Sequence, residues 1–389
     1  MTTPGPGDVL TLIRDGRART RGQVQEITGL SRVTVAQRVD ALLEAGLLRG
    51  AGQGAATGGR RAVELELDTT GSTIAVIALD SAHAELALTD LAGTVLERSS
   101  VPVSASDDPR ETLSTLAGAL TQLVAQSAHA GLATVADVAG IGISVPGPVD
   151  PRTRRLNEPP MLPRWDGFAV EDELRSALGC DVPVLLSRDA SAMAYGELTG
   201  TFPSAQVLVL VKVSTGIGAG IVIHGTLVEG EQGGAGDIGH IRVPEAAGRL
   251  CTCGAEGCLA TIASGRAVAA ALREAGRHAE SGSDVRALLA AGDPEAVRLT
   301  QQAGRQIGRV LASVVALLNP GVLLLSGDLD SDALVHGVRE SLYAAALPRA
   351  TRDLDVRSAR LANDAALVGM AALVVEQEFS ADAVNQRLS

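Results

Sequence analysis

One histidine and three cysteines constrain the fold of this chain most strongly. His240, Cys251, Cys253 and Cys258 carry imidazole and thiolate groups, the ligands that zinc prefers, and four such ligands complete a tetrahedron. A site closed in this way leaves no position for substrate or water. The pattern predicts a structural Zn²⁺ within a loop spanning 240–258. The alternatives are three reduced thiols near an unrelated histidine, or a disulfide between neighbouring cysteines.

The composition indicates a cytoplasmic protein with more than one domain. At 389 residues the chain is long enough for two or three hydrophobic cores. The first residues lack a basic-then-apolar signal pattern. The longest apolar stretches are interrupted, one by Lys212 and one by Asn319-Pro320, so we expect no membrane span. Cysteines stay reduced in the cytoplasm and are therefore available to a metal.

The charge is distributed unevenly along the chain. The net charge is −12, but residues 1–63 hold nine arginines against five acidic residues, a balance of +4. The remainder therefore carries −16. A basic N-terminal segment on an acidic body predicts contact with DNA at one end only.

Residues 1–66 have the pattern of a winged helix-turn-helix domain. Thr20 followed three positions later by Gln23 is a capping box that starts one helix, and Ser31 is placed to cap the next. In that second helix apolar residues recur at helical spacing and face inward. Its opposite face carries the candidates for contact with bases: Arg32, Thr34, Gln37 and Arg38.

A glycine-rich segment, GAGQGAATGG, then separates two short predicted strands and ends in Arg60 and Arg61. We interpret it as a wing that places both arginines on phosphate or in the minor groove. Arginine can form two hydrogen bonds with guanine, and glutamine can form two with adenine. The predicted partner is therefore double-stranded operator DNA. The alternative is a small helical bundle with a solvated basic face.

The rest of the chain, residues 72–389, predicts a two-lobed α/β body. Three strands, a helix and a buried strand occur early, and a similar order occurs again later. Two similar halves indicate a duplicated fold with a ligand cleft between its lobes. We place the lobes at roughly 72–185, together with the C-terminal helix, and 186–360.

The chain resembles the ROK family (repressors, open reading frames and sugar kinases), specifically its winged-helix repressor branch. The resemblance spans nearly the whole chain and is carried by LSRVTVAQRVDALLEAGLL, GGRR, GISVPGPVD, STGIGAGIV, GDIGH and CTCGAEGCL. It implies an actin-like body of the sugar kinase, Hsp70 and actin superfamily. It also implies zinc ligands that match His240, Cys251, Cys253 and Cys258 one for one.

The resemblance also implies that kinase activity has been lost. Family kinases carry D-x-G-[GA]-T at the first phosphate turn, and Asp80-Ser81-Ala82-His83-Ala84 aligns with it. Only the aspartate remains, and the imidazole of His83 would crowd the space that glycine leaves open. The second turn, Ser214–Gly220, is intact, but a glycine-rich turn is a weak signal that the fold alone can require. Asp189 aligns with the catalytic base, and we predict no catalytic residue.

The predicted ligand-binding residues depart from the family's sugar site. The aligned residues are Arg188, Asp189, Asp237 and His240, and Ala260 stands where the family has a glutamate. In one interpretation the ligand is a sugar phosphate or sugar acid that Arg188 grips. In another, Arg188 forms a structural salt bridge with Asp189 or Asp237 and the sugar is lost. Binding of a neutral sugar is the third.

The sequence thus predicts a ligand-responsive transcription regulator, usually a repressor, of carbohydrate-related genes. A homodimer or a dimer of dimers is expected, because helix-turn-helix heads read inverted repeats with two-fold symmetry. One rival is a sugar kinase with an appended DNA-binding head. Another is a ligand-independent regulator with a vestigial body. Trp165, the single tryptophan, either stacks on the ligand or packs at a domain edge.

Overall fold

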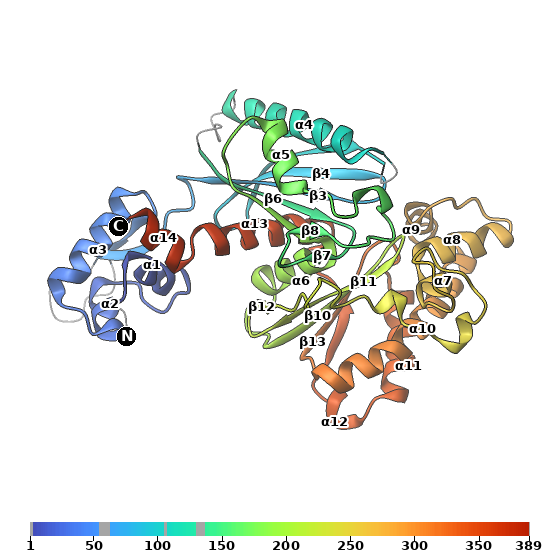
Figure 1. Ribbon diagram of the computed structural model, residues 1–389. Coiled ribbons are helices and arrows are strands. Elements are labelled where there is room, and N and C mark those ends of the chain that lie inside the picture. The colour runs from blue at the N-terminus through green and yellow to red at the C-terminus, as the bar shows by residue number, and fades with distance from the viewer. Residues whose placement is uncertain (1–2, 54–62, 105–106, 130–136, 389) are drawn as a thin grey trace.

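The computed structural model describes residues 3–53, 63–104, 107–129 and 137–388 and contains an N-terminal head and two lobes (Figure 1). The predicted fold class, α/β with a helix-turn-helix head followed by a duplicated actin-like body, is confirmed. In the described residues, no helix is long and apolar enough to cross a membrane.

The head begins its helices where the sequence predicts. The Thr20 side chain accepts a hydrogen bond from the Gln23 backbone, and the Gln23 side-chain oxygen accepts one from the Thr20 backbone, which completes the capping box. Ser31 caps the next helix by accepting a hydrogen bond from the Thr34 backbone, without a reciprocal bond. A two-stranded antiparallel sheet follows. The elements are α1 (Pro6–Arg14), α2 (Arg21–Thr28), α3 (Arg32–Glu44), β1 (Leu48–Gln53) and β2 (Val63–Leu67).

The last helix of the chain, α14 (Ala381–Arg387), packs on α1 of the head rather than on a lobe (Figure 1). Asn385 Oδ1 accepts a hydrogen bond from the Gly7 backbone at 2.7 Å, and α1 approaches so closely that a Cβ at Gly7 would overlap the Ala381 carbonyl. Apolar residues of the head and of the C-terminal segment share one hydrophobic core with one face of the lobe 1 sheet. The head is therefore joined to the body twice, by the segment between β2 and the next strand and by the contact of α1 with the C-terminal helix α14.

Lobe 1 contains a five-stranded sheet in the order β5-β4-β3-β6-β9. Alternate residues of its central strand face opposite sides, with Ile77 toward α4 and α5 and Val76 toward α13. The elements are β3 (Thr73–Leu79), β4 (His83–Asp90), β5 (Val95–Pro102), α4 (Pro109–His129), β6 (Val138–Val145), β7 (Val149–Asp150), β8 (Arg155–Leu156), a 3₁₀ turn (Pro163–Trp165), α5 (Val170–Leu178), β9 (Val184–Arg188) and, from the C-terminal part, α13 (Ala365–Glu378).

Lobe 2 repeats this arrangement with a sheet in the order β12-β11-β10-β13-β14. One face packs on α6 and the other on helices α7 to α12. The elements are α6 (Asp189–Gly200), β10 (Val207–Val213), β11 (Ile217–Ile223), β12 (Thr226–Leu227), α7 (Ala260–Ala263), α8 (Gly265–Glu274), α9 (Gly282–Ala290), α10 (Pro294–Leu318), β13 (Val322–Ser326), α11 (Asp332–Ala345), α12 (Pro348–Thr351) and β14 (Asp355–Ser358), with 3₁₀ turns Ile238–His240, Pro244–Ala246 and Ala362–Asp364.

Helices α6 and α13 cross between the two sheets and hold the lobes together (Figure 1). Glycine makes this crossing close, because a Cβ at Gly196 would overlap the Ala365 carbonyl and one at Gly369 would overlap that of Ala192. Since α13 continues toward α14, the same helix that contacts α6 also leads to the head. The fold therefore provides a direct connection between the region where the lobes meet and the N-terminal head.

Candidate functional site

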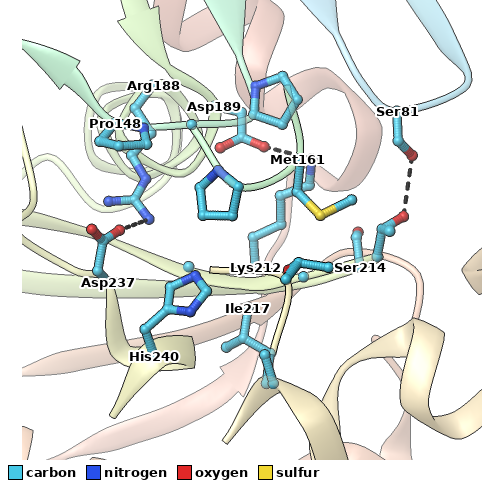
Figure 2. Close-up of a pocket in the computed structure, with 18 of the residues that line it drawn as sticks. Ser81, Pro148, Met161, Arg188, Asp189, Lys212, Ser214, Ile217, Asp237 and His240 are labelled. Atoms are coloured by element: carbon cyan, nitrogen blue, oxygen red, sulfur yellow. Dashed lines mark hydrogen bonds and ion pairs between the residues drawn. The ribbon is translucent and has the colours of Figure 1, made fainter. Parts of the chain in front are cut away.

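A cavity between the lobes brings together all the residues predicted to bind ligand (Figure 2). Lobe 1 contributes the end of β9 and the segments after β3 and β6, and lobe 2 contributes the β10–β11 turn and the 3₁₀ turn at Ile238–His240. Ala260, where a family member would carry a glutamate, also lines the cavity and is buried. The predicted ligand residues at its surface are Arg188, Asp189, Asp237 and His240.

Arg188 forms an ion pair across the cavity with Asp237, with 2.6 Å between Nη2 and Oδ1 (Figure 2). Its Nη1 also donates to the Ala235 carbonyl oxygen at 3.1 Å. The Arg188 side chain is only 10 % exposed, so its charge needs a partner, and Asp237 supplies it. This arrangement matches the structural salt bridge considered above and leaves Arg188 little uncompensated charge for an anion.

Asp189 is bound to a residue that sequence reasoning did not select. Lys212 Nζ lies 2.8 Å from Asp189 Oδ2 and 3.1 Å from Asp80 Oδ2. The ammonium beside it lowers the pKa of Asp80 to about 2. Burial by itself lowers the pKa of Lys212, but the two carboxylates outweigh burial and raise it above its ordinary value. Asp80 and Lys212 are therefore both charged at neutral pH.

The two turns that resemble phosphate loops touch each other. The hydroxyl oxygens of Ser81 and Thr215 lie 3.1 Å apart, which is a hydrogen bond between lobe 1 and lobe 2 (Figure 2). This contact and the Lys212 bridge lie on the same side of the cavity, where a kinase of this fold would need room for phosphate. In this structure the side chains of Asp80, Ser81 and Lys212 line the cavity there.

The four residues of the predicted metal loop converge as predicted. Their donor atoms all lie within 4.8 Å of one another. His240 Nδ1 is 3.6 Å from Cys251 Sγ, and Cys253 Sγ is 3.7 Å from Cys258 Sγ. A tetrahedral ion bound at about 2.0 Å by nitrogen and about 2.3 Å by sulfur would place such pairs about 3.5 and 3.8 Å apart. The donor set and its spacing therefore fit a tetrahedral metal ion.

The environment of these ligands also favours a cation. Burial, together with the neighbouring Cys253 and Cys251 thiols, raises the pKa of the Cys258 thiol to about 12, a penalty that a bound cation would offset. Burial lowers the pKa of His240 and keeps the imidazole neutral, which is its metal-binding form. Because His240 also lines the cavity, the metal loop and the ligand cleft share one residue.

The helix-turn-helix candidates are not equally accessible. Arg32 and Gln37 are exposed on α3, whereas the Thr34 hydroxyl is hydrogen-bonded to that of Ser31 at 2.8 Å. Arg38 is half-buried, and its Nη1 is fully covered. Arg60 and Arg61, the predicted wing residues, lie outside the described residues.

Sequence reasoning missed Val33, whose side chain is 67 % exposed although it is apolar. It occupies the second position of α3, four residues before Gln37, so the two lie on the same helical face. The signal was present in the sequence, because Val33 falls outside the inward-facing positions that the helical spacing marks.

Trp165 packs inside lobe 1 and is fully buried. Its ring meets that of Phe168 edge to face, with 6.1 Å between centroids. The tryptophan therefore neither stacks on a cleft ligand nor packs at a domain edge, but belongs to the core of lobe 1.

Comparison with known proteins relates the chain to both regulators and kinases. It matches the model of the ROK family over residues 75–377. It is 29 % identical over 319 residues to a glucokinase of Halalkalibacterium halodurans, covering 78 % of this chain and 94 % of the relative. It is 29 % identical over 361 residues to an N-acetylglucosamine repressor of Escherichia coli O6:H1, covering 87 % of this chain and 86 % of the relative.

A crystal structure of a ROK family transcriptional regulator, described as a homologue of the Escherichia coli MLC protein, is similar over 98 % of both chains. Its TM-score is 0.80 and its sequence identity 26 %. The chain is thus similar over nearly its whole length to a regulator and over a shorter stretch to a kinase.

Proposed function

Because the chain belongs to the ROK family, we propose that it is a transcription regulator whose head binds operator DNA and whose body senses a sugar or sugar derivative. One observation carries this proposal. A helix-turn-helix head shares its hydrophobic core with a body whose cleft holds the aligned catalytic base, Asp189, in an ion pair with Lys212. These two features support a sensor joined to a DNA reader, in which Asp189 is engaged by Lys212 rather than free to act as a base.

The N-terminal part of α3 reads bases in the major groove of the operator. Arg32 and Gln37 supply hydrogen bonds to guanine and adenine, and Val33 supplies an apolar contact for a thymine methyl group. Thr34 and Arg38 take part with less exposed surface, and the wing carries Arg60 and Arg61 to the DNA backbone or minor groove. Arg21, paired with Asp40 at 2.5 Å, holds α2 against α3 beside this surface.

The protein acts in the cytoplasm as a homodimer or a dimer of dimers. Two heads related by two-fold symmetry would read half-sites about 34–36 Å apart, one helical turn of DNA. A change in the angle between lobes would reach the heads through α13 and α14, which contact α6 and α1 respectively. Effector and operator would then oppose each other through a coupling free energy.

The effector binds in the cavity between the lobes, where Asp189, Asp237 and His240 offer hydrogen-bonding groups to hydroxyls. Arg188 orients Asp237 rather than gripping an anion, since the two already form an ion pair. This charge balance favours an uncharged sugar over a sugar phosphate or sugar acid.

The metal in the loop is zinc, held by His240, Cys251, Cys253 and Cys258. With four protein ligands it is structural and supplies no reaction chemistry. It fixes the position of His240 at the edge of the cleft.

The rival function is a sugar kinase with a DNA-binding head, and two observations favour it: Asp189 is present, and a glucokinase is among the relatives. It predicts ATP turnover on some sugar that Asp189→Ala abolishes. Our proposal predicts no turnover above the background of Asp189→Ala, and sugar-dependent ATP consumption by the unsubstituted protein would contradict it.

The main test starts from genomic footprinting of the protein, which supplies operator fragments and identifies the genes they control. Fragment binding is then measured by fluorescence anisotropy with each sugar or derivative that those genes act on. We expect nanomolar binding that one such compound shifts by about 5- to 150-fold, the usual range of allosteric coupling. Arg32→Ala should abolish specific binding, whereas Arg298→Ala, in a solvent-exposed pair on α10, should not. Operator binding that none of these compounds changes would favour a ligand-independent regulator.

A further inference from the structure

Lys212 is the single lysine of a chain that holds 33 lysine and arginine residues in total. It projects from β10 of lobe 2 and its side chain is 13 % exposed. Its two carboxylate partners come from elsewhere: Asp80 follows β3 of lobe 1, and Asp189 begins α6. A single ammonium group therefore joins both lobes and the helix between them.

Two carboxylates that converge on one buried point need a cation between them. Without one, repulsion would raise the pKa of one carboxylate until it took up a proton. Here the Asp189 side chain is 12 % exposed and that of Asp80 is 31 % exposed, so solvent cannot supply that compensation fully. Carboxylate oxygens converging in this way are also the ligands that divalent cations prefer.

The ammonium group is suited to this position because it is compact. It interacts as a point charge with donors in three directions, whereas a guanidinium is a larger, planar group whose donors all lie in one plane. All the remaining lysine-or-arginine positions of the chain hold arginine, so the lysine at position 212 is distinctive.

We propose that Lys212 is a specificity-determining residue of the cleft, in which its ammonium takes the place of a divalent cation and excludes any ligand that needs one. A nucleoside triphosphate is such a ligand, because it enters protein sites together with Mg²⁺. The hydrogen bond between Ser81 and Thr215 closes the same side of the cavity. The cleft thus takes a metal-free ligand beside Arg188 and His240, and no ligand that needs a divalent cation at Asp80 and Asp189.

This inference rests on the proposed function, in which the cleft binds one effector, whereas the cleft of a kinase binds both a sugar and a nucleotide. The test is independent of DNA binding. Mn²⁺ is titrated into the zinc-loaded full-length protein, and binding is followed by water proton relaxation. The variants are Lys212→Met, which keeps the length but removes the charge, Lys212→Arg, and the double variant Lys212→Met/Asp80→Asn.

We expect no saturable Mn²⁺ binding to the unsubstituted protein or to Lys212→Arg. Lys212→Met should gain saturable Mn²⁺ binding, at least about tenfold tighter than the weakest binding that the titration of the unsubstituted protein could detect. The reason is that the two freed carboxylates are oxygen ligands of the kind that divalent cations take. Adding Asp80→Asn should remove that gain. Mn²⁺ binding to the unsubstituted protein that Asp80→Asn abolishes would overturn the proposal, and so would a folded Lys212→Met variant that gains no Mn²⁺ site.

A second measurement needs no substitution and covers the case in which Lys212→Met does not fold. Because the chain has one lysine, ¹⁵N-lysine labelling gives a single side-chain resonance that reports Lys212 alone. We expect a slowly exchanging ammonium that does not shift when Mg²⁺ and a non-hydrolysable ATP analogue are added. A resonance typical of solvated lysine, or one that shifts with the nucleotide, would contradict the proposal. Operator binding, measured on the same sample, shows separately whether the proposed function fails.

Discussion

The two lobes share a strand order and pairing pattern but differ at the turn after their first strand. β3 pairs antiparallel with β4 and parallel with β6, and β10 does the same with β11 and β13. In lobe 1 the turn begins at Asp80 and carries His83, whereas in lobe 2 it begins at Ser214 and keeps the glycines of the family pattern. Duplication therefore preserved the framework while the two turns diverged.

The glycines of the lobe 2 turn are retained for packing rather than for phosphate. A Cβ at Gly220 would overlap the Ala190 carbonyl oxygen on α6, and one at Gly218 would press on the Arg188 guanidinium. At Gly216, the position nearest the tip, a Cβ would meet no atom within 4 Å. The comparison teaches that an intact glycine pattern does not by itself indicate nucleotide binding, because the fold can need the same residues.

The metal loop is present in lobe 2 and has no counterpart among the described residues of lobe 1, and breaking it should have the largest effect. Cys251→Ser removes a buried thiolate ligand, so we expect metal loss, destabilisation of about 3 kcal/mol or roughly 5–10 °C in Tm, and weaker operator binding. Elemental analysis measures the metal content, thermal unfolding measures the Tm, and fluorescence anisotropy measures operator binding.

The matched control is Cys180→Ser, since Cys180 is the one cysteine outside the cluster. It should retain the metal and bind operator normally. A metal-free Cys251→Ser protein that represses fully would show that the loop is not needed for DNA binding.

The packing role of the lobe 2 glycines can be tested with a pair of substitutions. Gly220→Ala should destabilise the protein by about 2–3 kcal/mol, because the added methyl group overpacks the contact with α6. Gly216→Ala should change stability by less than about 0.5 kcal/mol, as expected of a surface position. Urea unfolding measures both. Equal effects of the two substitutions would remove the distinction drawn between them.

Between the lobes, the ion pair of Arg188 and Asp237 should contribute less. Arg188→Met leaves Asp237 without its partner, but Asp237 is 36 % exposed and water compensates it in part. We therefore expect a loss of about 1–2 kcal/mol. A double-mutant cycle with Asp237→Asn, followed by chemical unfolding, isolates the coupling between the two residues. Additive effects would indicate that the pair carries no structural energy and that Arg188 remains available to a ligand.

We expect the smallest effect from the pH dependence of folding stability. Asp80, which begins the lobe 1 turn, carries a carboxyl group that titrates, whereas Ser214, which begins the lobe 2 turn, does not. The folded-state pKa of Asp80 is lowered to about 2, below its ordinary value, so its ionised form favours folding. This contribution is complete above about pH 4 and disappears as the pH falls from 4 toward 2. The stability difference between the protein and Asp80→Asn, measured by urea unfolding, should therefore be constant at pH 5–7 and shrink below pH 4. A difference that grows on acidification would contradict the assigned charge state.

Much of the site followed from local sequence. The caps at Thr20 and Ser31 depend on residues three positions apart, and the metal loop on residues within one short segment, so both were readable without a fold. Family motifs also placed Arg188 and Asp237 in one cleft correctly. Their ion pair remained one of several interpretations, because pairing depends on the distance between two lobes.

The amino-acid sequence by itself determined the types of element, the His/Cys cluster that could hold a metal and the departure of residues 80–84 from the family's first phosphate turn, since each depends on neighbouring residues. Only the tertiary structure decided that Lys212 lies between Asp80 and Asp189 and that α14 belongs with the head. Asp80 and Lys212 are separated by more than a hundred residues, as are α14 and α1. No local pattern encodes such contacts, because they arise when separate sheets and helices pack around a common core.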